Sequence, residues 1–366
     1  MYFGPKEFIP SGRQASDLVT TTGAQVQLLN KSRLGDSILS VGVNGSAFAY
    51  NTDLSFVSTN AFAATDLSGW VSELVPGFKL RVSDSFLYTP EPPAFLTGGK
   101  PNELSDVFSR GIQAVRANTF TNTVQTQSEY SLSRLVSLRS DYSYSLYKVG
   151  QIFLTSLGGV PVAFFDTSVH NVATGPTYRF DGGDTLFLKY NYVAAESSGQ
   201  GVSIRYGAHA IVPEYVSKVI PGWLVTISAG ATIVEQVQNR TYFAGKFALT
   251  TNYEKPTRLQ LSLSRQAAPA FFGTGGALMS NTAQLLVTHG FSKILKLTVS
   301  GNYAYNESTP VDVFTFKSIT GSALLEYKLT RSTVLGLSQE YSQFSYTGIS
   351  TFDRHATMIT LRTEWK

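Results

Sequence analysis

The chain has 366 residues, a formal net charge of +4, no cysteine and only 15% charged residues. Without cysteine it has no disulfide bond, thiolate metal site or thiol nucleophile. Its apolar stretches fall short of the roughly 18 residues that a membrane-spanning helix requires, which excludes a helical membrane protein. No linker, charged block or shift in composition divides the sequence, so residues 1–366 are expected to form a single domain.

The composition favours β-strands. It includes 19 Tyr, 24 Phe and 31 Gly, and aromatic and β-branched side chains fit the pleated surface of a sheet. Residues 1–6 (MYFGPK) begin neither the basic nor the apolar segment of a secretory signal. An outer-membrane protein needs such a signal, so we expect a mature form or a chain that lacks its beginning.

Alternation of apolar and polar residues recurs from one end of the chain to the other, as in strands with one face toward lipid and the other toward water. Residues 18–29 and 78–88 are early expected strands. In the second of these, Asp84 falls on the otherwise apolar face, which indicates a bulge, a partner or a wrong register.

The alternation is clearest from residue 136 onward. It continues through residues 136–146, 242–253, 258–264, 295–306, 318–329 and 359–365. The side chains expected to face lipid include Leu138, Phe247, Leu261 and Leu297. These strands exceed the five or six residues, roughly, of a typical soluble strand, and their length suits a tilted membrane crossing.

The connections differ in length. Short connections at 132–134, 181–184 and 329–332 alternate along the chain with longer ones at 88–118 and 150–166. This asymmetry is typical of bacterial barrels. With the C-terminus in the periplasm, the short connections are expected to be periplasmic, beside an aromatic girdle of Tyr130, Tyr253 and Tyr327. Segment 89–119 is expected to fold over or into the mouth, with a short helical turn at 102–110.

These patterns predict an all-β fold, a transmembrane antiparallel up-and-down β-barrel of about 16–18 strands. We count about 17, whereas a single-chain bacterial barrel should have an even number. Counting back from the C-terminus, the strand at 18–29 already runs from outside to inside. An N-terminal strand upstream of it is therefore expected, and 18 is the favoured total.

Other classes of protein fit less well. A soluble β-sandwich also shows alternation, but it buries its apolar face against a second sheet. The four histidines, His170, His209, His289 and His355, lack metal-ligand spacing, and residues 273–276 (GTGG) lack the ending of a phosphate-binding loop. A protease or lipase site assembled across strands at the outer rim stays open. Dispersed cations argue against nucleic acid. We expect no enzyme, no catalytic residue, no metal and no cofactor.

Four segments carry a resemblance to a known group: residues 82–92 (VSDSFLYTPEP), 262–266 (SLSRQ), 270–276 (AFFGTGG) and 301–306 (GNYAYN). They resemble the outer-membrane β-barrel porins associated with exosortase (PEP-CTERM) exopolysaccharide systems. The resemblance covers most of the chain and implies an outer-membrane pore linked to polysaccharide export or surface assembly, with no catalytic residues. In that group a further strand usually comes first, so the start at Met1 departs from the pattern.

The alternation also predicts which charged side chains line the lumen: Lys79, Arg81, Arg139, Asp141, Lys189, Arg205, Lys246, Arg258, Lys296 and Glu326. The same alternation also places Glu129, Lys328, Glu340, Arg362 and Glu364 inside. The alternative is that Lys328, Arg362 and Glu364 sit at the periplasmic rim and pair with one another. Cations prevail in these sets, and a basic wall concentrates anions. Ion pairing at the rim would cancel part of this effect.

The expected function is that of a porin-like channel in the outer membrane of a Gram-negative-type bacterium. Small solutes would pass passively, or polysaccharide would be exported, through a mildly basic lumen. The alternative is a structural sleeve or secretion-complex component that encloses a periplasmic partner. The expected partners are outer-membrane lipid, anionic solutes or acidic polysaccharide, and a periplasmic export component.

Overall fold

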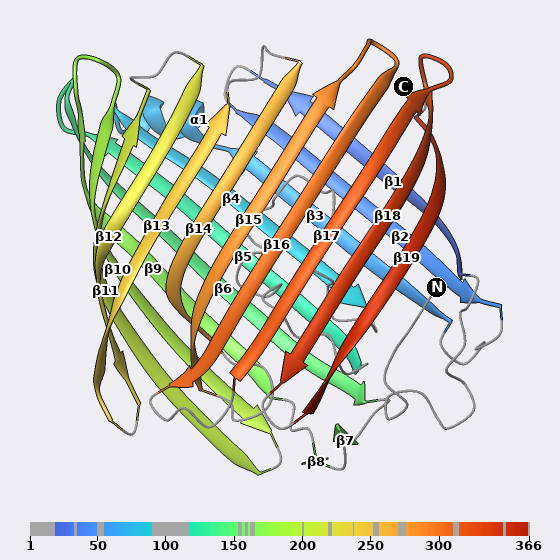
Figure 1. Ribbon diagram of the computed structural model, residues 1–366. Helices are drawn as coiled ribbons and strands as arrows, with labels where there is room; N and C mark the ends of the chain where they lie inside the picture. The colour runs from blue at the N-terminus through green and yellow to red at the C-terminus, as the bar shows by residue number, and fades with distance from the viewer. Residues whose placement is uncertain are drawn as a thin grey trace.

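The computed structural model describes residues 19–32, 35–49, 55–89, 117–152, 156–157, 160–161, 165–199, 201–218, 222–236, 238–251, 256–269, 276–309, 315–346 and 349–364. Strands account for most of these residues (Figure 1). Within these ranges, helices that are long and apolar enough to cross a membrane do not occur.

The strands and the one helix of the described ranges follow in chain order. They are β1 (Val19–Lys31), β2 (Asp36–Phe48), β3 (Phe56–Asp66), α1 (Ser68–Leu74), β4 (Phe78–Thr89), β5 (Ala117–Ser131), β6 (Val136–Ile152), β7 (Ser156–Leu157), β8 (Val160–Pro161), β9 (Asp166–Arg179), β10 (Thr185–Gly199), β11 (Val202–Ser217), β12 (Trp223–Glu235), β13 (Arg240–Thr251), β14 (Thr257–Pro269), β15 (Ala277–Gly290), β16 (Leu295–Thr309), β17 (Thr315–Lys328), β18 (Thr333–Tyr346) and β19 (Ile349–Thr363).

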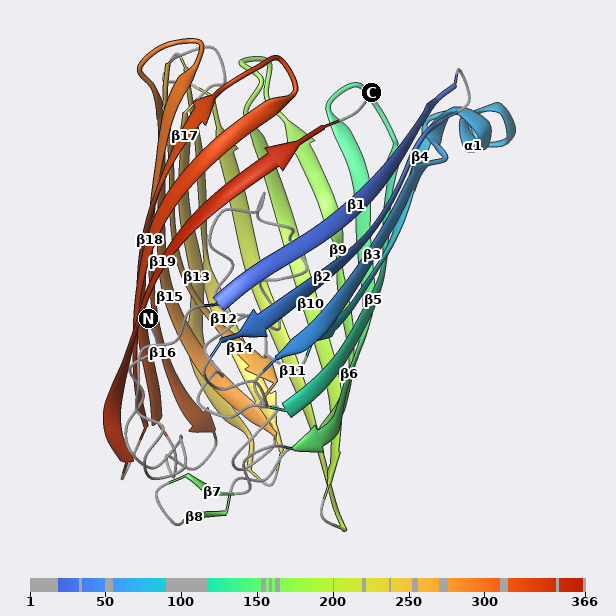
Figure 2. The same cartoon turned by 90° about the vertical axis from the view of Figure 1, so that its right-hand side faces the viewer.

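All strands except β7 and β8 form one 17-stranded sheet, in which each strand pairs antiparallel with the next along the chain. The sheet curves around a central space (Figures 1 and 2). The predicted all-β, up-and-down architecture of 16–18 strands is therefore confirmed. Strands β1 and β19 are its two edges, and no ladder between them exists within the described ranges. Strands β7 and β8 pair only with each other.

The two ends of the sheet carry different connections. We call the end with the turns at 132–135 and 329–332 the short-turn end, and the opposite end the loop end. The predicted difference in length between the connections of the two ends holds only in part. The short-turn end also carries the long connection 67–77 with α1, and at the loop end β10 and β11 are joined by residues 200–201 alone. The predicted helical turn at 102–110 and Tyr253 lie outside the described residues.

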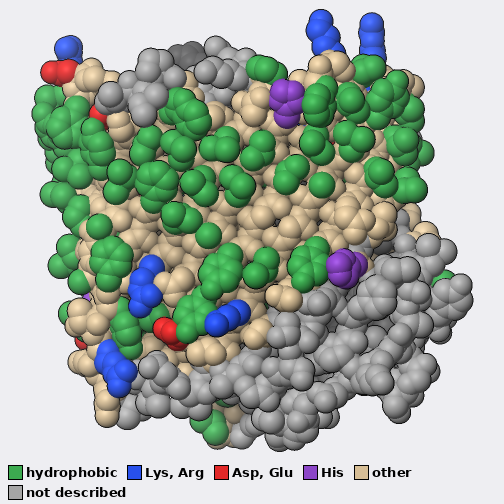
Figure 3. Space-filling view, viewed as in Figure 1, with side chains coloured by type: hydrophobic (Ala, Val, Ile, Leu, Met, Phe, Trp, Pro, Cys, Tyr) green, Lys and Arg blue, Asp and Glu red, His purple; other side chains and the backbone are tan. Residues whose placement is uncertain are grey.

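Side chains alternate between the two faces of the sheet. Exposed apolar residues such as Leu138, Ile211 and Leu263 lie on the outer face, and Figure 3 shows hydrophobic side chains over much of the upper part of one view, with charged ones at the rim and toward the loop end. As the alternation predicted, Asp84 interrupts the apolar face of its strand. Asp84 lies on the outer face, where its carboxylate accepts a hydrogen bond of 2.8 Å from the Asn122 amide.

On the inner face, small hydroxyl side chains bond from strand to strand. Ser264 and Thr282 lie 2.6 Å apart, and Ser300 and Ser322 lie 2.7 Å apart. Such cross-strand pairs are the unit that stabilises a sheet. They also satisfy polar groups that would otherwise lack partners.

Two prolines lie in the interior of long strands, each at a gap in one ladder. Pairing between β9 and β10 is interrupted beside Gly175 and Pro176, and pairing between β11 and β12 is interrupted beside Pro213. Proline has no N–H to donate to a ladder, so a gap is where a strand tolerates it. Within the second gap, opposite Val212, a Cβ added to Gly230 would lie 1.9 Å from the Ile211 carbonyl oxygen, so only glycine fits there.

The turn at 180–184 is held by a buried carboxylate. Asp184 accepts hydrogen bonds from the Tyr215 hydroxyl, from the Lys218 N–H at 2.8 Å and from the Ser217 hydroxyl at 3.3 Å. The bond from Tyr215, followed by the one from Lys218, holds the pKa of Asp184 below its ordinary value. This side chain therefore fastens the turn between β9 and β10 to the end of β11.

The depressed pKa predicts how Asp184→Asn changes stability with pH. A depressed folded-state pKa adds stability above the unfolded value of about 3.9 and loses it as the pH falls through the folded value. The wild-type chain should therefore resist guanidinium better than Asp184→Asn at pH 7, and this advantage should shrink below pH 4, roughly. Equal midpoints at pH 7 would contradict the stabilising role.

Candidate functional site

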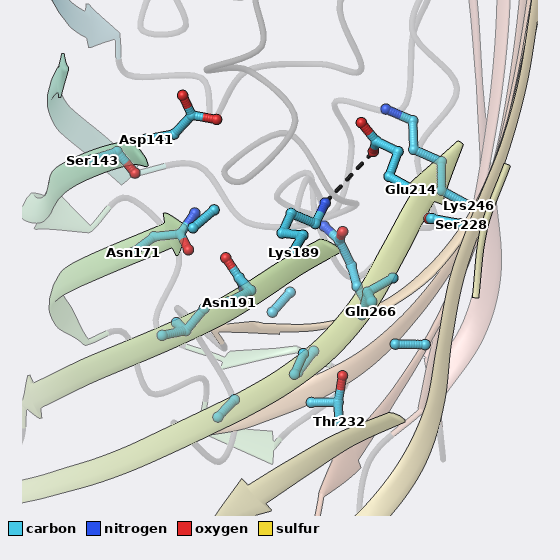
Figure 4. Close-up of a pocket in the computed structure, with 18 of the residues that line it drawn as sticks. Asp141, Ser143, Asn171, Lys189, Asn191, Glu214, Ser228, Thr232, Lys246 and Gln266 are labelled. Atoms are coloured by element: carbon cyan, nitrogen blue, oxygen red, sulfur yellow. Dashed lines mark ion pairs between the residues drawn. The ribbon is translucent and has the colours of Figure 1, made fainter. Parts of the chain in front are cut away.

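The inner wall contains a polar cavity, which we call the chamber. It has a volume of about 420 Å³ and is lined by residues of β5, β6 and β9–β14. Figure 4 shows Asn171, Asn191, Thr232 and Gln266 around it, with Asp141 and Ser143 on one side and Lys246 on the other. Because amide and hydroxyl groups both donate and accept hydrogen bonds, this lining suits a hydrated or hydroxyl-rich solute.

Six charged residues line the chamber, and four of them form pairs. A fifth, Arg265, belongs to the outward series of Leu261 and Leu263 and donates to the Asn281 amide oxygen at 2.7 Å. Arg139 contacts Asp141 at 2.7 Å, and Lys189 contacts Glu214 at 3.6 Å. Lys246 projects from β13 beside Ser228, and within the described ranges its ammonium group has neither a carboxylate nor a hydrogen-bond partner. Among the residues that the structure describes, Lys246 therefore gives the chamber a positive charge that no carboxylate compensates.

Further ion pairs lie on the inner face toward the short-turn end. Glu129 pairs with Arg179, while Glu326 contacts Lys296 at 2.7 Å and Arg362 at 3.8 Å. Arg362 also lies 3.6 Å from Glu364. Several charges near this rim are thus compensated.

The register places most of the predicted lumen residues on the inner face. Lys79, Arg81, Arg139, Asp141, Lys189, Lys246, Arg258, Lys296 and Glu326 all lie there, as do Glu129, Lys328, Glu340 and Arg362. Four of them, Arg139, Asp141, Lys189 and Lys246, meet at the chamber. Lys296 and Glu326 meet elsewhere.

The prediction for Arg205 is wrong. Arg205 lies opposite Glu196 on the outer face, and its guanidinium group donates to that carboxylate at 2.9 Å. Its neighbour Tyr206 points inward and is only 4% exposed. On β11 the inward series is the apolar one, so a rule that places polar residues inside assigns this strand the wrong way round.

Sequence reasoning also missed two ion-pair partners on the inner face. Glu214 and Arg179 were not among the expected lumen residues, yet they pair with Lys189 and Glu129. Glu214 follows Pro213 directly, and the register of β11 is the same on both sides of the gap there, so Glu214 belongs to the inward series. A signal existed, because residues 210, 212, 214 and 216 form one series of β11.

At the loop end the wall folds inward. Pairing between β13 and β14 stops at Gly245 and Arg265, although β13 continues beside β12 to Arg240 and β14 continues beside β15 to Pro269. The segments that leave the wall comprise residues 266–269 of β14, 277–280 of β15 and 306–309 of β16, and we call them the inturned segment. It splits the wall between β13 and β14.

Contacts place the inturned segment on the inner side of β12 and β13. The Tyr242 hydroxyl on the inner face of β13 bonds to Thr309 at the end of β16. Ala277, which pairs with Thr309, belongs to one buried apolar cluster with Val234 of β12 and with Tyr206 and Ala208 of β11. In the wall, β13 and β14 lie between the strand of Val234 and the strand of Ala277. The two residues can therefore meet only if the inturned segment crosses the inside of the sheet, where it fills part of the lumen.

Polar groups within the inturned segment are buried without partners. Asn306 and Ser280 face each other across β15 and β16 and are both 0% exposed. Among the described residues, their side-chain polar atoms have no hydrogen-bond partner. Each such group costs about 1–3 kcal/mol. Apolar packing of the inturned segment therefore has to offset the free-energy cost of these buried polar groups.

The outer face holds all four histidines, each beside another polar or aromatic side chain. Tyr142 and Tyr190 bond to His170 and His209, Thr257 bonds to His289, and Tyr341 stacks near His355. In the described part of the chain, no group of three or more His, Cys, Asp or Glu residues is placed to hold a metal ion.

No protein-family model and no curated protein matches the chain. Solved structures with similar arrangements include the FrpB iron transporter from Neisseria meningitidis (9% identity, TM-score 0.49, covering 94% of this chain and 63% of that one). Two more are the siderophore receptor PiuA from Acinetobacter baumannii (10%, 0.44, 91% and 64%) and the alcaligin outer membrane receptor FauA from Bordetella pertussis (12%, 0.42, 94% and 63%). The chain spans less than two thirds of each of them, and similarity this low assigns it to no family.

Proposed function

We propose that this chain is an outer-membrane channel of a Gram-negative-type bacterium that passes small solutes by diffusion and prefers anions. The observation that carries the proposal is the contrast between the two faces of the sheet. Apolar side chains are exposed on the outside, whereas the inside holds a chamber of amides, hydroxyls and ion pairs. A lipid-facing exterior with a polar interior is the pattern of a membrane barrel.

The preference for anions depends on Lys246. The expected surplus of inner cations becomes smaller once Arg205 lies outside and Glu214 lies inside. The chamber nevertheless keeps one uncompensated ammonium group, in a wall of low dielectric where a single charge acts strongly on ions. Anions should therefore be enriched at this point of the passage.

Replacement of this charge tests the proposal. Lys246→Glu turns the excess charge of the chamber negative, so the anion preference measured from the reversal potential across a salt gradient should decrease or invert. Arg205→Glu makes the same change of charge on the outer face and should leave the reversal potential unchanged. Both measurements belong at low salt, where screening is weakest.

The outcomes separate clearly. A cation preference in the wild-type chain, or equal shifts in both variants, would contradict the assigned role of Lys246. Absence of conductance in every variant would reject the channel itself.

The resemblance to exosortase-associated barrels extends this proposal to a cargo. Acidic sugars and acidic exopolysaccharide combine carboxylates with many hydroxyls. The ammonium group of Lys246 suits the carboxylate, and the amides of Asn171, Asn191 and Gln266 suit the hydroxyls. Current block by galacturonate oligomers that exceeds block by neutral oligomers of equal length would support this cargo.

A further inference from the structure

The short helix α1 presents an apolar face to its surroundings. Trp70, Leu74 and Val75 are 54%, 69% and 45% exposed. Trp70 and Leu74 are four residues apart and share one side of the helix. Soluble surfaces seldom gather a large indole and two aliphatic side chains in this way unless the patch contacts a partner or a membrane.

The helix is held firmly where it begins and ends. The Leu67 N–H donates to the Leu80 carbonyl at 2.8 Å, and the Ser68 hydroxyl accepts from the Leu80 N–H at 3.1 Å. Beyond the helix, Gly77 has a φ of +83°, and its carbonyl accepts from the Ser131 N–H at 2.9 Å. These contacts with β4 and β5 fix the orientation of the exposed face.

That orientation is outward. Figure 2 shows α1 beyond the short-turn end of β4, on the side away from the central space. The outer face of the wall just below it carries Phe78 and Tyr130, whose ring centroids lie 6.5 Å apart, and exposed Leu138. The apolar face of α1 therefore continues the apolar surface that we assign to lipid.

We propose that α1 lies in the membrane interface, with Trp70, Leu74 and Val75 inserted between the lipid headgroups and the acyl chains. Tryptophan is enriched at this level of a bilayer because the ring is apolar and its N–H stays near water. Helices with one apolar face bind there in the plane of the membrane. The polar side chains Ser68 and Ser72 turn toward the protein backbone instead. The partner of this surface is the bilayer itself.

This inference rests on the proposed membrane location, and tryptophan fluorescence tests the two separately. The chain has three tryptophans, so Trp223→Phe with Trp365→Phe leaves only Trp70. The matched control, Trp70→Phe with Trp365→Phe, leaves Trp223, which lies on the outer face at the same end of the wall. Both full-length variants are reconstituted in phosphatidylcholine vesicles with and without bromine on the acyl chains near the headgroup.

Because an interfacial helix sits roughly 5–10 Å into the headgroup boundary, brominated lipid should lower the emission of Trp70 about twofold, and that of Trp223 similarly. Trp70 should also resist aqueous acrylamide. Quenching of Trp223 by brominated lipid together with quenching of Trp70 by acrylamide alone would overturn the interfacial role of α1. If brominated lipid quenches neither residue, the proposed location of the wall fails as well.

Discussion

A disulfide between Phe243→Cys and Ala267→Cys is expected to raise the conductance of the channel. These positions follow the last β13–β14 pair, Gly245 with Arg265, and would face each other if that ladder continued. The disulfide would draw the end of β14 back into the wall and remove the inturned segment from the lumen. Since the chain has no cysteine of its own, any disulfide comes from the introduced pair.

A matched control uses the part of the ladder that is already formed. Phe247→Cys with Leu263→Cys joins two residues that pair in the structure and lie on the same outer face. This disulfide should form readily and leave the single-channel conductance unchanged. Conductance of the first variant should return to its initial value after reduction.

Two results would contradict the obstructing role. If the 243–267 disulfide forms and conductance stays the same, the inturned segment does not limit the passage. If that disulfide does not form in the folded protein while the control forms, β13 and β14 do not close together. The extent of cross-linking is measured on gels and does not depend on whether the chain conducts.

A charge introduced on the outer face is expected to impair folding more than the same charge introduced on the inner face. Leu261 of β14 pairs with Leu249 and Leu285, which puts it on the outer face, whereas its neighbour Ser262 lies on the inner face. An arginine facing lipid near mid-depth costs about 2–4 kcal/mol. Leu261→Arg should therefore abolish the heat-modifiable folded form on gels, and Ser262→Arg should retain it. The reverse order would reject the assigned faces.

The fold could be predicted because period-two alternation is a local property of each strand. Leu138, Phe247, Leu261 and Leu297 all lie on the face that the alternation assigned to them. Asp84 was correctly singled out, because a carboxylate on an apolar face needs a partner, and Asn122 supplies it.

The chamber could be predicted only in part. Arg139, Asp141, Lys189 and Lys246 were assigned to the inner face from the alternation, but their meeting in one cavity depends on how the sheet curves. The error at Arg205 has the same origin. The inturned segment packs apolar side chains against the inside of β11, so Tyr206 and Ala208 point inward and the charged residue points out. Packing between strands that are distant in the sequence cannot be predicted from the alternation within a single strand.

The two free edges of the sheet affect the width of the interior. In a closed barrel, strand number and stagger together determine the diameter. In the described part of this chain, β1 and β19 run in the same direction and no ladder joins them, so the sheet can bend to a smaller or larger radius while every existing ladder bond stays intact. Bending is a softer deformation than breaking hydrogen bonds, so in the membrane location that we propose the lateral pressure of the lipid would act directly on the width of this open sheet.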